Sequence, residues 1–506
     1  MIVSITPEIG IDEIPIYAGG LGILEGDKFL EAARRDLNYT VLTLFYRRGY
    51  VYYDVVDGEI KEIEKDFSNY RSLLREEEPL EVSYDGEKIL IKPLVYTLNK
   101  ARIVYFDISG PEKFSRKLDR LYIEDETYSF EAKYSILAKA SYEYMDKRIG
   151  FKNISIIDIQ ESLASLISLL LPHSIRKRLI IHTPGPWGHP KFSRETLSRE
   201  FGYIDGEQIL TKISASRVDE VYTVSEKHYE ITLSTFPEFS GKLSYVTNGI
   251  NIERWVHREI KKFYKLDKID PRDFHEAHMK AKIELVDLLK NYKKIDVDSD
   301  KMIISWARRV TRYKRPYFMI RLAEDLADRD DVLIVLGGKA HPKDLEGLGY
   351  MRIFRELHEE YKNVVYIHDY DVEKAKLILS GSDLLLFTPF PGWEASGTSF
   401  MKAGANGVPS LASRDGAALE MIRDGFNGWF FGSDIRYPID LYSTSASEID
   451  QRDYKDFHEK LMMILDLYHE DYDSYVEIMI NSMKTYGIEA DIWRVLKTLY
   501  SDIMNR

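Results

Sequence analysis

The sequence has 506 residues, more than one hydrophobic core usually serves, so we expect two large domains. Hydrophobic residues make up 44% and charged residues 30% of a chain without any long charge-free stretch, which argues against disorder and against a membrane-spanning helix. The net charge of -13 disfavours a general nucleic-acid-binding role, and the absence of cysteine excludes disulfides, thiolate metal sites and cysteine nucleophiles.

The start of the chain and its composition predict an intracellular location. The first residues have the pattern of a strand followed by Pro7 and Glu8, without the basic stretch and apolar segment of a signal peptide. A chain without cysteine suits a reducing compartment. The abundance of Ile, Lys, Glu and Tyr is typical of proteins from hyperthermophiles. We therefore expect a cytoplasmic protein.

Short apolar runs rich in β-branched residues alternate with helical patterns along most of the chain. This alternation predicts an α/β fold with parallel sheets. The strands expected on this basis are Ile2–Ile5, Val41–Phe45, Ile154–Ile157, Leu179–His182, Val221–Val224, Met302–Ser305, Val332–Leu336, Val364–Ile367 and Asp383–Phe387.

Two segments interrupt this rhythm and suggest where the domains meet. Val51–Asp107 is charge-rich and alternating, which predicts antiparallel hairpins inserted into the first domain. Residues 256–300 are helical and strongly charged and precede the strand that begins at Met302. We expect an N-terminal Rossmann-like domain over residues 1–255, a helical linker over 256–300 and a second Rossmann-like domain over 301–480.

The end of the chain has helical periodicity and no further strand pattern. From Ser447 onward, Phe457, Leu461, Ile464 and Tyr468 fall on one apolar face. We expect terminal helices that close the fold, the last of which, over residues 481–506, crosses back to the first domain.

Ligands of open α/β sheets bind beyond the carboxyl ends of the strands, so the loops directly after strands are the candidate sites. The first such loop, Pro15–Asp27, contains Gly19, Gly20 and Gly22. Glycines permit close approach of a ligand to the backbone, and the following helix can present N–H groups to an anion. The same pattern also suits a tight turn selected for its geometry alone.

His182 ends a predicted strand in the run IHTPGPWGH. A lone histidine usually has a structural role, but this place in the sequence also suits a ligand contact. The twelve histidines include none with the spacing of metal ligands on one helix, so we expect no metal site.

A run of basic residues follows the strand that begins at Met302. Ala307–Arg315 has five cations within nine residues, and guanidinium and ammonium groups at a strand end indicate a phosphate site. The alternative is a solvated basic helix face. The next loop, Gly337–Pro342, has two glycines and Lys339, which suit either an anion or a simple turn.

The segment Glu394–Gly407, EASGTSFMKAGANG, follows the last predicted strand. Gly397 and Thr398 lie where a helix can begin, and Lys402 falls one helical turn later on the same face. This geometry suits a phosphorylated cofactor held by its phosphate and through a lysine, and pyridoxal phosphate is the commonest cofactor of that kind. For an isolated lysine, a surface position on a helix would be the simpler interpretation.

Taken together and in order, these segments resemble the glycogen and α-glucan (maltodextrin) phosphorylases. That family consists of retaining glycosyltransferases with pyridoxal phosphate and the GT-B architecture, in which two Rossmann-like domains face across a cleft. The matching segments are PEIG at Pro7–Gly10, IYAGGLGILEGD at Ile16–Asp27, FYRRGY at Phe45–Tyr50, TNGI at Thr247–Ile250, the basic run Arg308–Arg315, GKAHP at Gly338–Pro342, the pair Asp369 and Tyr370, EASGTSFMK at Glu394–Lys402 and the run Asp415–Met421.

The resemblance implies a set of roles around the cofactor. Lys402 would carry pyridoxal 5'-phosphate covalently and would be a catalytic residue together with Arg309, Lys314 and His182. The cofactor phosphate and ring would be held by Gly397, Thr398, Arg308, Tyr370 and Trp255.

The resemblance also implies the substrate contacts. Arg309 and Lys314, with backbone N–H groups of the loop that contains Gly19, Gly20 and Gly22, would bind inorganic phosphate or the phosphate of glucose 1-phosphate. Asn248, Glu394 and Ser396 would bind sugar hydroxyls. The backbone carbonyl and the side chain of His182 would contact the glucosyl residue.

The implied reaction is reversible phosphorolysis of an α-1,4-glucan or maltodextrin to glucose 1-phosphate with retention of configuration. An NDP-glucose-dependent glycogen or starch synthase is the main alternative, because such enzymes share the GT-B fold, a GGLG loop and paired cations, although they do not use a cofactor lysine. An inactive carbohydrate-binding relative is a second alternative. The segment Asp158–Glu161, DIQE, replaces a histidine-bearing loop of the family, which leaves its role open together with the oligomeric state.

Overall fold

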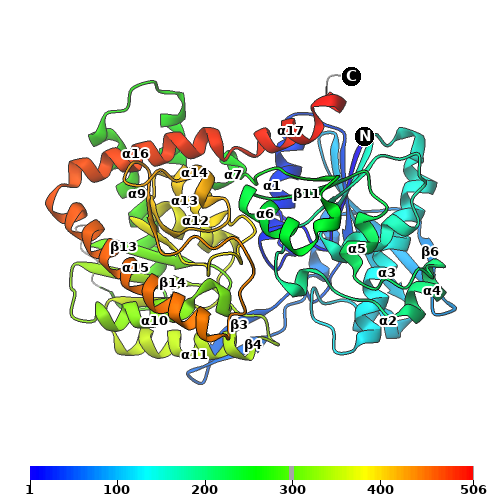
Figure 1. Cartoon of the computed structure of the whole chain (residues 1–506), viewed down its shortest axis with the longest axis horizontal. Helices are drawn as coiled ribbons and strands as arrows, with labels where there is room; N and C mark the ends of the chain where they lie inside the picture. Colours follow the sequence, from blue (N-terminus) through cyan, green and yellow to red (C-terminus); the bar gives the residue numbers. More distant parts are fainter. Residues whose placement is uncertain (296–300, 505–506) are drawn as a thin grey trace. The chain divides into compact units, whose positions relative to one another are not determined.

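The computed structural model describes residues 1–295 and 301–504. The chain divides into two units, each with its own sheet (Figure 1). The first unit comprises Met1–Tyr50, Glu64–Thr247 and Val495–Arg506, and the second comprises Val51–Ile63 and Asn248–Arg494. Among the described residues, no helix combines the length and the apolar composition that crossing a membrane requires.

The sheet of the first unit has a parallel centre with an antiparallel extension at one edge. Its strand order is β12-β11-β10-β9-β1-β2-β8-β7-β5, and the strands from β12 to β8 run parallel. The bounds are β1 (Ile2–Ile5), β2 (Tyr39–Leu44), β5 (Arg75–Glu76), β6 (Leu80–Tyr84), β7 (Glu87–Leu98), β8 (Ala101–Gly110), β9 (Ile156–Gln160), β10 (Lys177–Ile180), β11 (Glu220–Thr223) and β12 (Leu243–Tyr245).

The helices of the first unit follow its strands. They are α1 (Gly20–Arg34), α2 (Glu112–Lys117), α3 (Thr127–Tyr144), α4 (Arg194–Phe201), α5 (Leu210–Ala215) and α6 (Glu226–Thr235). The chain runs outward from β1 through β2 to β8 and then returns to β9 on the other side of β1. The direction of winding therefore reverses between β1 and β9, which is where such sheets form their ligand crevices.

The second unit has a parallel sheet of six strands in the order β15-β14-β13-β16-β17-β18. Numbered along the chain this is 3-2-1-4-5-6, the order of dinucleotide-binding folds, and the winding reverses between β13 and β16. The strand bounds are β13 (Met302–Ala307), β14 (Val332–Gly337), β15 (Val364–Ile367), β16 (Leu384–Phe387), β17 (Ser410–Ser413) and β18 (Trp429–Phe431).

Helices also alternate with the strands of the second unit. They are α7 (Ile252–Trp255), α8 (Arg258–Lys261), α9 (Pro271–Leu289), α10 (Pro316–Asp325), α11 (Leu345–Glu360), α12 (Val372–Gly381), α13 (Ser399–Ala405), α14 (Ala418–Met421), α15 (Thr444–Glu470) and α16 (Tyr472–Glu489). The two parallel sheets confirm the predicted α/β class with two Rossmann-like units. The apolar face that was predicted for the terminal helices is buried in α15.

Two parts of the structure differ from the expected insertion at residues 51–107. The hairpin β3 (Tyr52–Val56) and β4 (Glu59–Ile63) belongs to the second unit, where the Tyr53 hydroxyl donates to the Ala340 carbonyl over 3.2 Å and Lys339 lies 4.4 Å from the Tyr52 ring centre. The strand β8 is part of the parallel sheet, because it pairs with β2 as well as with β7. Alternation within the sequence did not distinguish this parallel strand from a hairpin strand.

The segment expected to link the domains is part of the second unit from Asn248 onward. The apolar face of α9, with Leu285 and Leu289, packs into the core with Ile303, Val335 and Ile367 of the sheet. Residues 296–300 of the expected linker lie outside the described residues.

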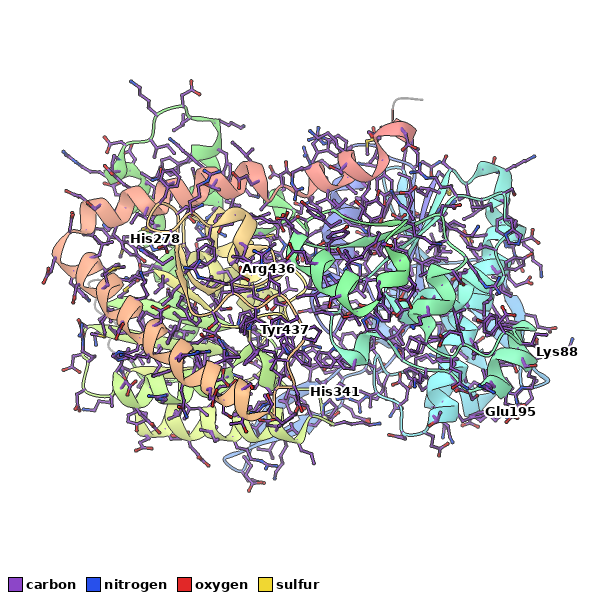
Figure 2. All side chains as sticks on the ribbon, in the orientation of Figure 1. Lys88, Glu195, His278, His341, Arg436 and Tyr437 are labelled. Carbon is purple, nitrogen blue, oxygen red and sulfur yellow. The ribbon has the colours of Figure 1, made fainter. Side chains whose placement is uncertain are left out.

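A buried ionic cluster joins α9 to the amino-terminal end of β16. The side chain of Asp383 accepts from His278 (labelled in Figure 2) over 3.0 Å, from Lys282 over 2.8 Å and from the Ile303 backbone N–H over 2.7 Å. Lys282 also donates to the Tyr468 hydroxyl over 3.2 Å. The cluster therefore ties α9, β13, α15 and the start of β16 together.

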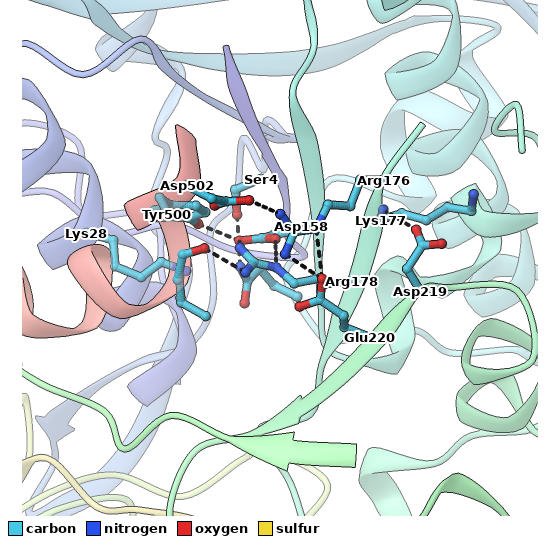
Figure 3. Close-up of polar contacts among 12 residues, drawn as sticks. Ser4, Lys28, Asp158, Arg176, Lys177, Arg178, Asp219, Glu220, Tyr500 and Asp502 are labelled. Atoms are coloured by element: carbon cyan, nitrogen blue, oxygen red, sulfur yellow. Dashed lines mark hydrogen bonds and ion pairs between the residues drawn. The ribbon is translucent and has the colours of Figure 1, made fainter. Parts of the chain in front are cut away.

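The last helix, α17 (Ile492–Met504), is assigned to the first unit from Val495 onward. There, Tyr500 donates to Asp158, and Arg178 bonds both Asp158 over 2.8 Å and the Leu499 carbonyl over 2.8 Å (Figure 3). Arg178 and Asp158 come from the adjacent parallel strands β10 and β9. A buried ion pair of the sheet thus fixes the position of this helix.

Candidate active site

The sequence-predicted residues of the second unit gather at the carboxyl edge of its sheet. Arg308 follows β13, Gly338 follows β14, Tyr370 follows β15, and the segment Glu394–Lys402 follows β16. These four strands are neighbours, and their carboxyl ends share one edge because they are parallel. The loops after β13 and β16 flank the point where the winding reverses, which is the usual ligand position.

Glu394 is the centre of a buried ionic group. Arg308 Nη2 donates to Glu394 Oε2 over 2.7 Å, and Lys314 Nζ donates to the same oxygen. All three side chains are less than one-tenth exposed. Burial would raise the pKa of Glu394, but Lys314 and then Arg308 outweigh it and hold that pKa below its ordinary value.

Asp415 holds the loop that presents Glu394. Its fully buried carboxylate accepts from the backbone N–H groups of Gly392, Trp393 and Glu394 over 2.8–3.1 Å. Sequence reasoning gave Asp415 no role, although it begins the matched run Asp415–Met421. An acidic residue next to glycine, directly after the strand that follows the predicted loop, was the available signal.

Several polar atoms in this group lack a partner among the described residues. They are Arg308 Nε, Arg308 Nη1 and Ser396 Oγ, all buried. Burial lowers the pKa of Arg308, and the guanidinium carries donors that a buried site normally satisfies. The donor set therefore fits an anionic ligand with several oxygen acceptors.

Lys402 lies in α13 with its ammonium 3.8 Å from the centre of the Trp255 ring. Asn406 links the two segments, because its amide donates to the carbonyl of Trp255 over 3.0 Å and to that of Lys402 over 2.8 Å. Asn406 is fully buried and was not a candidate from the sequence. The structure thus brings together two residues that the resemblance placed at the cofactor.

The turn before α13 requires glycine. Gly397 has φ +72°, and a Cβ atom there would lie 2.4 Å from Phe387 Cζ. The guanidinium of Arg308 stacks over the same Phe387 ring, with 4.4 Å to its centre. Thr398 is the N-cap residue of α13, and its carbonyl accepts from the Lys402 backbone N–H over 3.1 Å.

Arg309 and Tyr313 form a second pair beside Lys314. Arg309 Nη2 donates to the Tyr313 hydroxyl over 3.1 Å, and Lys314 Nζ lies 4.6 Å from the Tyr313 ring centre. Burial would raise the pKa of Tyr313, but Lys314 and then Arg309 lower it below its ordinary value. Tyr313 was not a sequence candidate, although it stands between two of the cations.

Four of the five cations in the basic run bind carboxylates of the chain, and Arg312 and Arg315 do so away from Glu394. Arg315 is fully buried with φ +57° and pairs with Asp450 and Asp453 of α15, each over 2.8 Å. Arg312 pairs with Glu346 of α11 over 2.6 Å. The sequence interpretation of the run as a phosphate site did not reveal these two internal ion pairs, because the partners of Arg312 and Arg315 are remote in sequence.

Two further candidates of the second unit are buried or packed near this edge. Tyr370 packs against Gly337, where an added Cβ would lie 3.1 Å from its ring, and burial raises the pKa of its hydroxyl. Asn248 is buried, and its carbonyl accepts from Arg494 over 3.2 Å.

The remaining candidates, Gly19, Gly20, Gly22 and His182, belong to the first unit. The carboxylate Oε2 of Glu8 accepts from the backbone N–H groups of Ala18 over 2.6 Å and of Gly19 over 3.2 Å. In this structure the Gly19 N–H therefore serves an internal carboxylate, which the sequence interpretation did not foresee. Gly22 is required for packing, because an added Cβ would lie 2.6 Å from Glu8 Oε2.

His182 lies just beyond β10, whose last residue is Ile180 and not His182 as expected. Its ring Nε2 is 2.8 Å from Gln160 Oε1, and its backbone N–H donates to Glu161 Oε2 over 3.2 Å. Gln160 is the last residue of β9, and Glu161 follows it. His182 therefore contacts the end of one of the two strands between which the winding of the first sheet reverses.

A model of the carbohydrate phosphorylase family matches residues 257–497. The match covers just under half of the chain, and over these residues the chain is similar to the carbohydrate phosphorylases. The matched residues include the ionic group around Glu394 and the lysine of α13.

Similar proteins extend the likeness over most of the chain. The chain is 27% identical to a maltodextrin phosphorylase of Thermococcus litoralis, over 98% of this chain and 69% of that protein. It is 26% identical to a glycogen phosphorylase of Aquifex aeolicus, over 85% of this chain and 76% of that protein. An uncharacterized protein of Methanocaldococcus jannaschii is 25% identical, over 80% of this chain and 83% of that protein.

Proposed function

We propose that this protein is an α-glucan phosphorylase, a retaining hexosyltransferase that degrades α-1,4-glucan or maltodextrin with inorganic phosphate. The observation that supports this most directly is the buried group of Arg308, Lys314 and Glu394, in which Arg308 keeps two donors without a partner among the described residues. An acidic protein that buries such donors at the carboxyl edge of a sheet is suited to bind an oxyanion there.

We further propose that the site takes pyridoxal 5'-phosphate. Lys402 would hold the cofactor, its phosphate would meet Arg308, Gly397 and Thr398, and its ring would pack near Trp255 and Tyr370. The unsatisfied guanidinium of Arg308 and the side-chain-free turn at Gly397 fit a phosphate group. When bound, the cofactor supplies a phosphate that assists proton movement to and from the substrate phosphate.

The remaining residues would bind the substrates. Arg309 and Lys314 would hold inorganic phosphate or the phosphate of glucose 1-phosphate, and the positive field around them would offset the repulsion between two phosphates. Sugar hydroxyls would form hydrogen bonds with Asn248, Glu394 and Ser396. His182 would contact the glucosyl unit. We propose the same role in phosphate binding for the loop that contains Gly20.

The reaction exchanges one bond at the anomeric carbon. The bond from C1 to the glycosidic oxygen breaks, and a bond from C1 to an oxygen of hydrogen phosphate forms on the same face. The proton of the hydrogen phosphate passes to the departing oxygen, which becomes the 4-hydroxyl of the shortened glucan. Lys314 and Arg309 would stabilise the anionic phosphate as it attacks, and the low exposure of Glu394 and its partners would exclude water that competes for C1.

An NDP-glucose-dependent synthase is not favoured, because its chemistry has no use for Lys402. A cytoplasmic location suits an enzyme without cysteine whose substrates are phosphate and intracellular glucans. To test the function, the purified protein is incubated with maltodextrin and phosphate, and separately with maltodextrin and UDP- or ADP-glucose. We expect glucose 1-phosphate from the first mixture and no glucan elongation in the second, and the reverse result would replace the proposal with a synthase.

A further inference from the structure

His182 is held from two directions by the end of β9. Glu161 Oε2 accepts from the His182 backbone N–H over 3.2 Å and from the Thr183 hydroxyl over 2.7 Å. Gln160 Oε1 lies 2.8 Å from the ring Nε2 of His182. The backbone and the ring of His182 are therefore positioned by neighbouring residues of the segment Asp158–Glu161.

The hydrogen bonds behind Gln160 have a defined direction. The Ser4 hydroxyl donates its single proton to Glu25 Oε2 over 2.8 Å. Ser4 can therefore only accept from Gln160, whose amide Nε2 donates to it over 3.1 Å. With its NH₂ group directed at Ser4, Gln160 presents its carbonyl oxygen to His182. That oxygen can only accept, so the proton of the ring must reside on Nε2.

A buried ion pair in α1 determines the donor and the acceptor in each of these hydrogen bonds. Glu25 pairs with Lys28 three residues later, and both side chains are almost fully buried. Tyr39 also donates to Glu25 Oε2 over 3.3 Å. A buried Glu–Lys pair is costly to desolvate and contributes little net stability, so its presence beneath the sheet requires another explanation. The Glu25 carboxylate pairs with the Lys28 ammonium, and a carboxylate can only accept a hydrogen bond.

We propose that Glu25, Ser4 and Gln160 are positioning residues for His182. They hold the neutral ring with its proton on Nε2 and leave Nδ1 as the hydrogen-bond acceptor for a hydroxyl donor of the glucosyl unit. The nature of that ligand rests on the proposed function, whereas the tautomer of His182 does not. The segment Asp158–Glu161 thereby acquires a role: it fixes a histidine that follows the next strand, β10, instead of contributing one.

The electrostatic surroundings agree with a neutral ring. Burial, then Lys28 and then His228, lower the pKa of His182 well below its ordinary value. A neutral imidazole with a fixed donor nitrogen has one free lone pair, on Nδ1. Such a ring nitrogen binds a hydroxyl group that donates a hydrogen bond, and it does not bind a group that can only accept one.

The tautomer can be observed directly in the full-length protein labelled with ¹⁵N-histidine. The His182 signals are assigned by their loss in His182→Gln, and the ring nitrogen that carries the proton is identified from its one-bond coupling. We expect His182 to carry the proton on Nε2 alone across neutral pH. A proton on Nδ1, or a mixture of the two forms, would overturn the proposal.

Two substitutions test the relay, and one should restore it. Ser4→Ala removes the acceptor that orients the Gln160 amide, and Gln160→Met removes the amide itself. In either variant, a fraction of the molecules should carry the His182 proton on Nδ1. Gln160→Glu retains an oxygen that accepts from Nε2 and should keep the original tautomer. The exposed Gln451→Met is the matched control. An unchanged His182 tautomer in both Ser4→Ala and Gln160→Met would contradict the relay.

Kinetics then separate the tautomer from the function of the site. In phosphorolysis we expect Ser4→Ala to lower kcat/KM roughly tenfold, the effect of one hydrogen bond, with the KM for phosphate unchanged. If the tautomer shifts but the wild type shows no phosphorolysis, the relay stands and the proposed function fails. If phosphorolysis occurs and kcat/KM is unchanged in a variant whose tautomer has shifted, the ligand contact of Nδ1 is refuted.

Discussion

The strand β16 carries a buried carboxylate beyond each of its ends, and the two carboxylates differ in how they are satisfied. Asp383 precedes the strand and accepts from His278, Lys282 and a backbone N–H, and Lys282 has further oxygen partners. Glu394 follows the strand and accepts from Arg308 and Lys314, but Arg308 retains two donor nitrogens without a partner among the described residues.

The difference separates a structural ionic cluster from a ligand site. The amino-terminal edge of a parallel sheet serves stability, and the side-chain oxygens of Asp383 and the ammonium of Lys282 all have partners there, although the buried His278 Nδ1 has none among the described residues. The carboxyl-terminal edge of such sheets receives ligands, and we propose that an anion completes the group around Glu394. We expect the two carboxylates to respond in opposite ways to substitution and to phosphate.

The largest effect is expected for Glu394→Gln. The substitution removes the counter-charge that orients Arg308 and Lys314, so kcat/KM for phosphorolysis should fall by roughly 10²–10³. The matched control is Glu346→Gln, which affects a carboxylate bound to Arg312 in the same unit and should leave kcat/KM close to that of the wild type. If kcat/KM fell equally in the two variants, Arg308 and Lys314 would not differ in function from Arg312.

Substitution of Asp383, in contrast, should affect the stability of the protein more than its activity. Asp383→Asn leaves Lys282 buried without its counter-ion, so the free energy of unfolding in urea should fall by about 3–5 kcal/mol. The activity of the folded fraction should persist. Phosphate should not restore the stability of Asp383→Asn, whereas it should restore that of Glu394→Gln relative to chloride at equal ionic strength. Rescue of both variants by phosphate would show that neither carboxylate marks a specific anion site.

A smaller effect is expected from pH. Burial would raise the pKa of Asp383, but Lys282 and then His278 lower it from its ordinary value of 3.8 to about 2. A depressed pKa contributes stability above the unfolded value that is lost as pH falls through the folded value. The difference corresponds to about 2 kcal/mol, lost between roughly pH 4 and pH 2. Thermal unfolding of the wild type and Asp383→Asn should converge over this range, and parallel curves would contradict the assignment.

Much of the site was predictable because its residues are close in sequence to strand ends. Arg308, Lys314, Glu394 and Lys402 follow strands with clear apolar patterns, and parallel pairing brings those ends together. The roles of Arg315 and Gln160 were not predictable, because their partners lie far away along the chain. Asp453 is 138 residues from Arg315, and Ser4 is 156 residues from Gln160.

The fold was predictable to a similar extent and for the same reason. The central strands have continuous apolar runs, whereas β8 pairs parallel on one side and antiparallel on the other, and its alternation does not reveal this. The hairpin β3 and β4 has exposed residues that gave no indication of which unit it would join.

The central claim is that Lys402 holds pyridoxal phosphate in the anion site beside Arg308. The purified protein is supplied with pyridoxal phosphate, reduced with borohydride, and examined by intact mass and peptide mapping, with Lys402→Arg and the exposed Lys455→Arg treated in parallel. We predict one phosphopyridoxyl group on Lys402 in the wild type and in Lys455→Arg, and none in Lys402→Arg. A wild-type chain without the adduct, or with the adduct on another lysine, would contradict the claim.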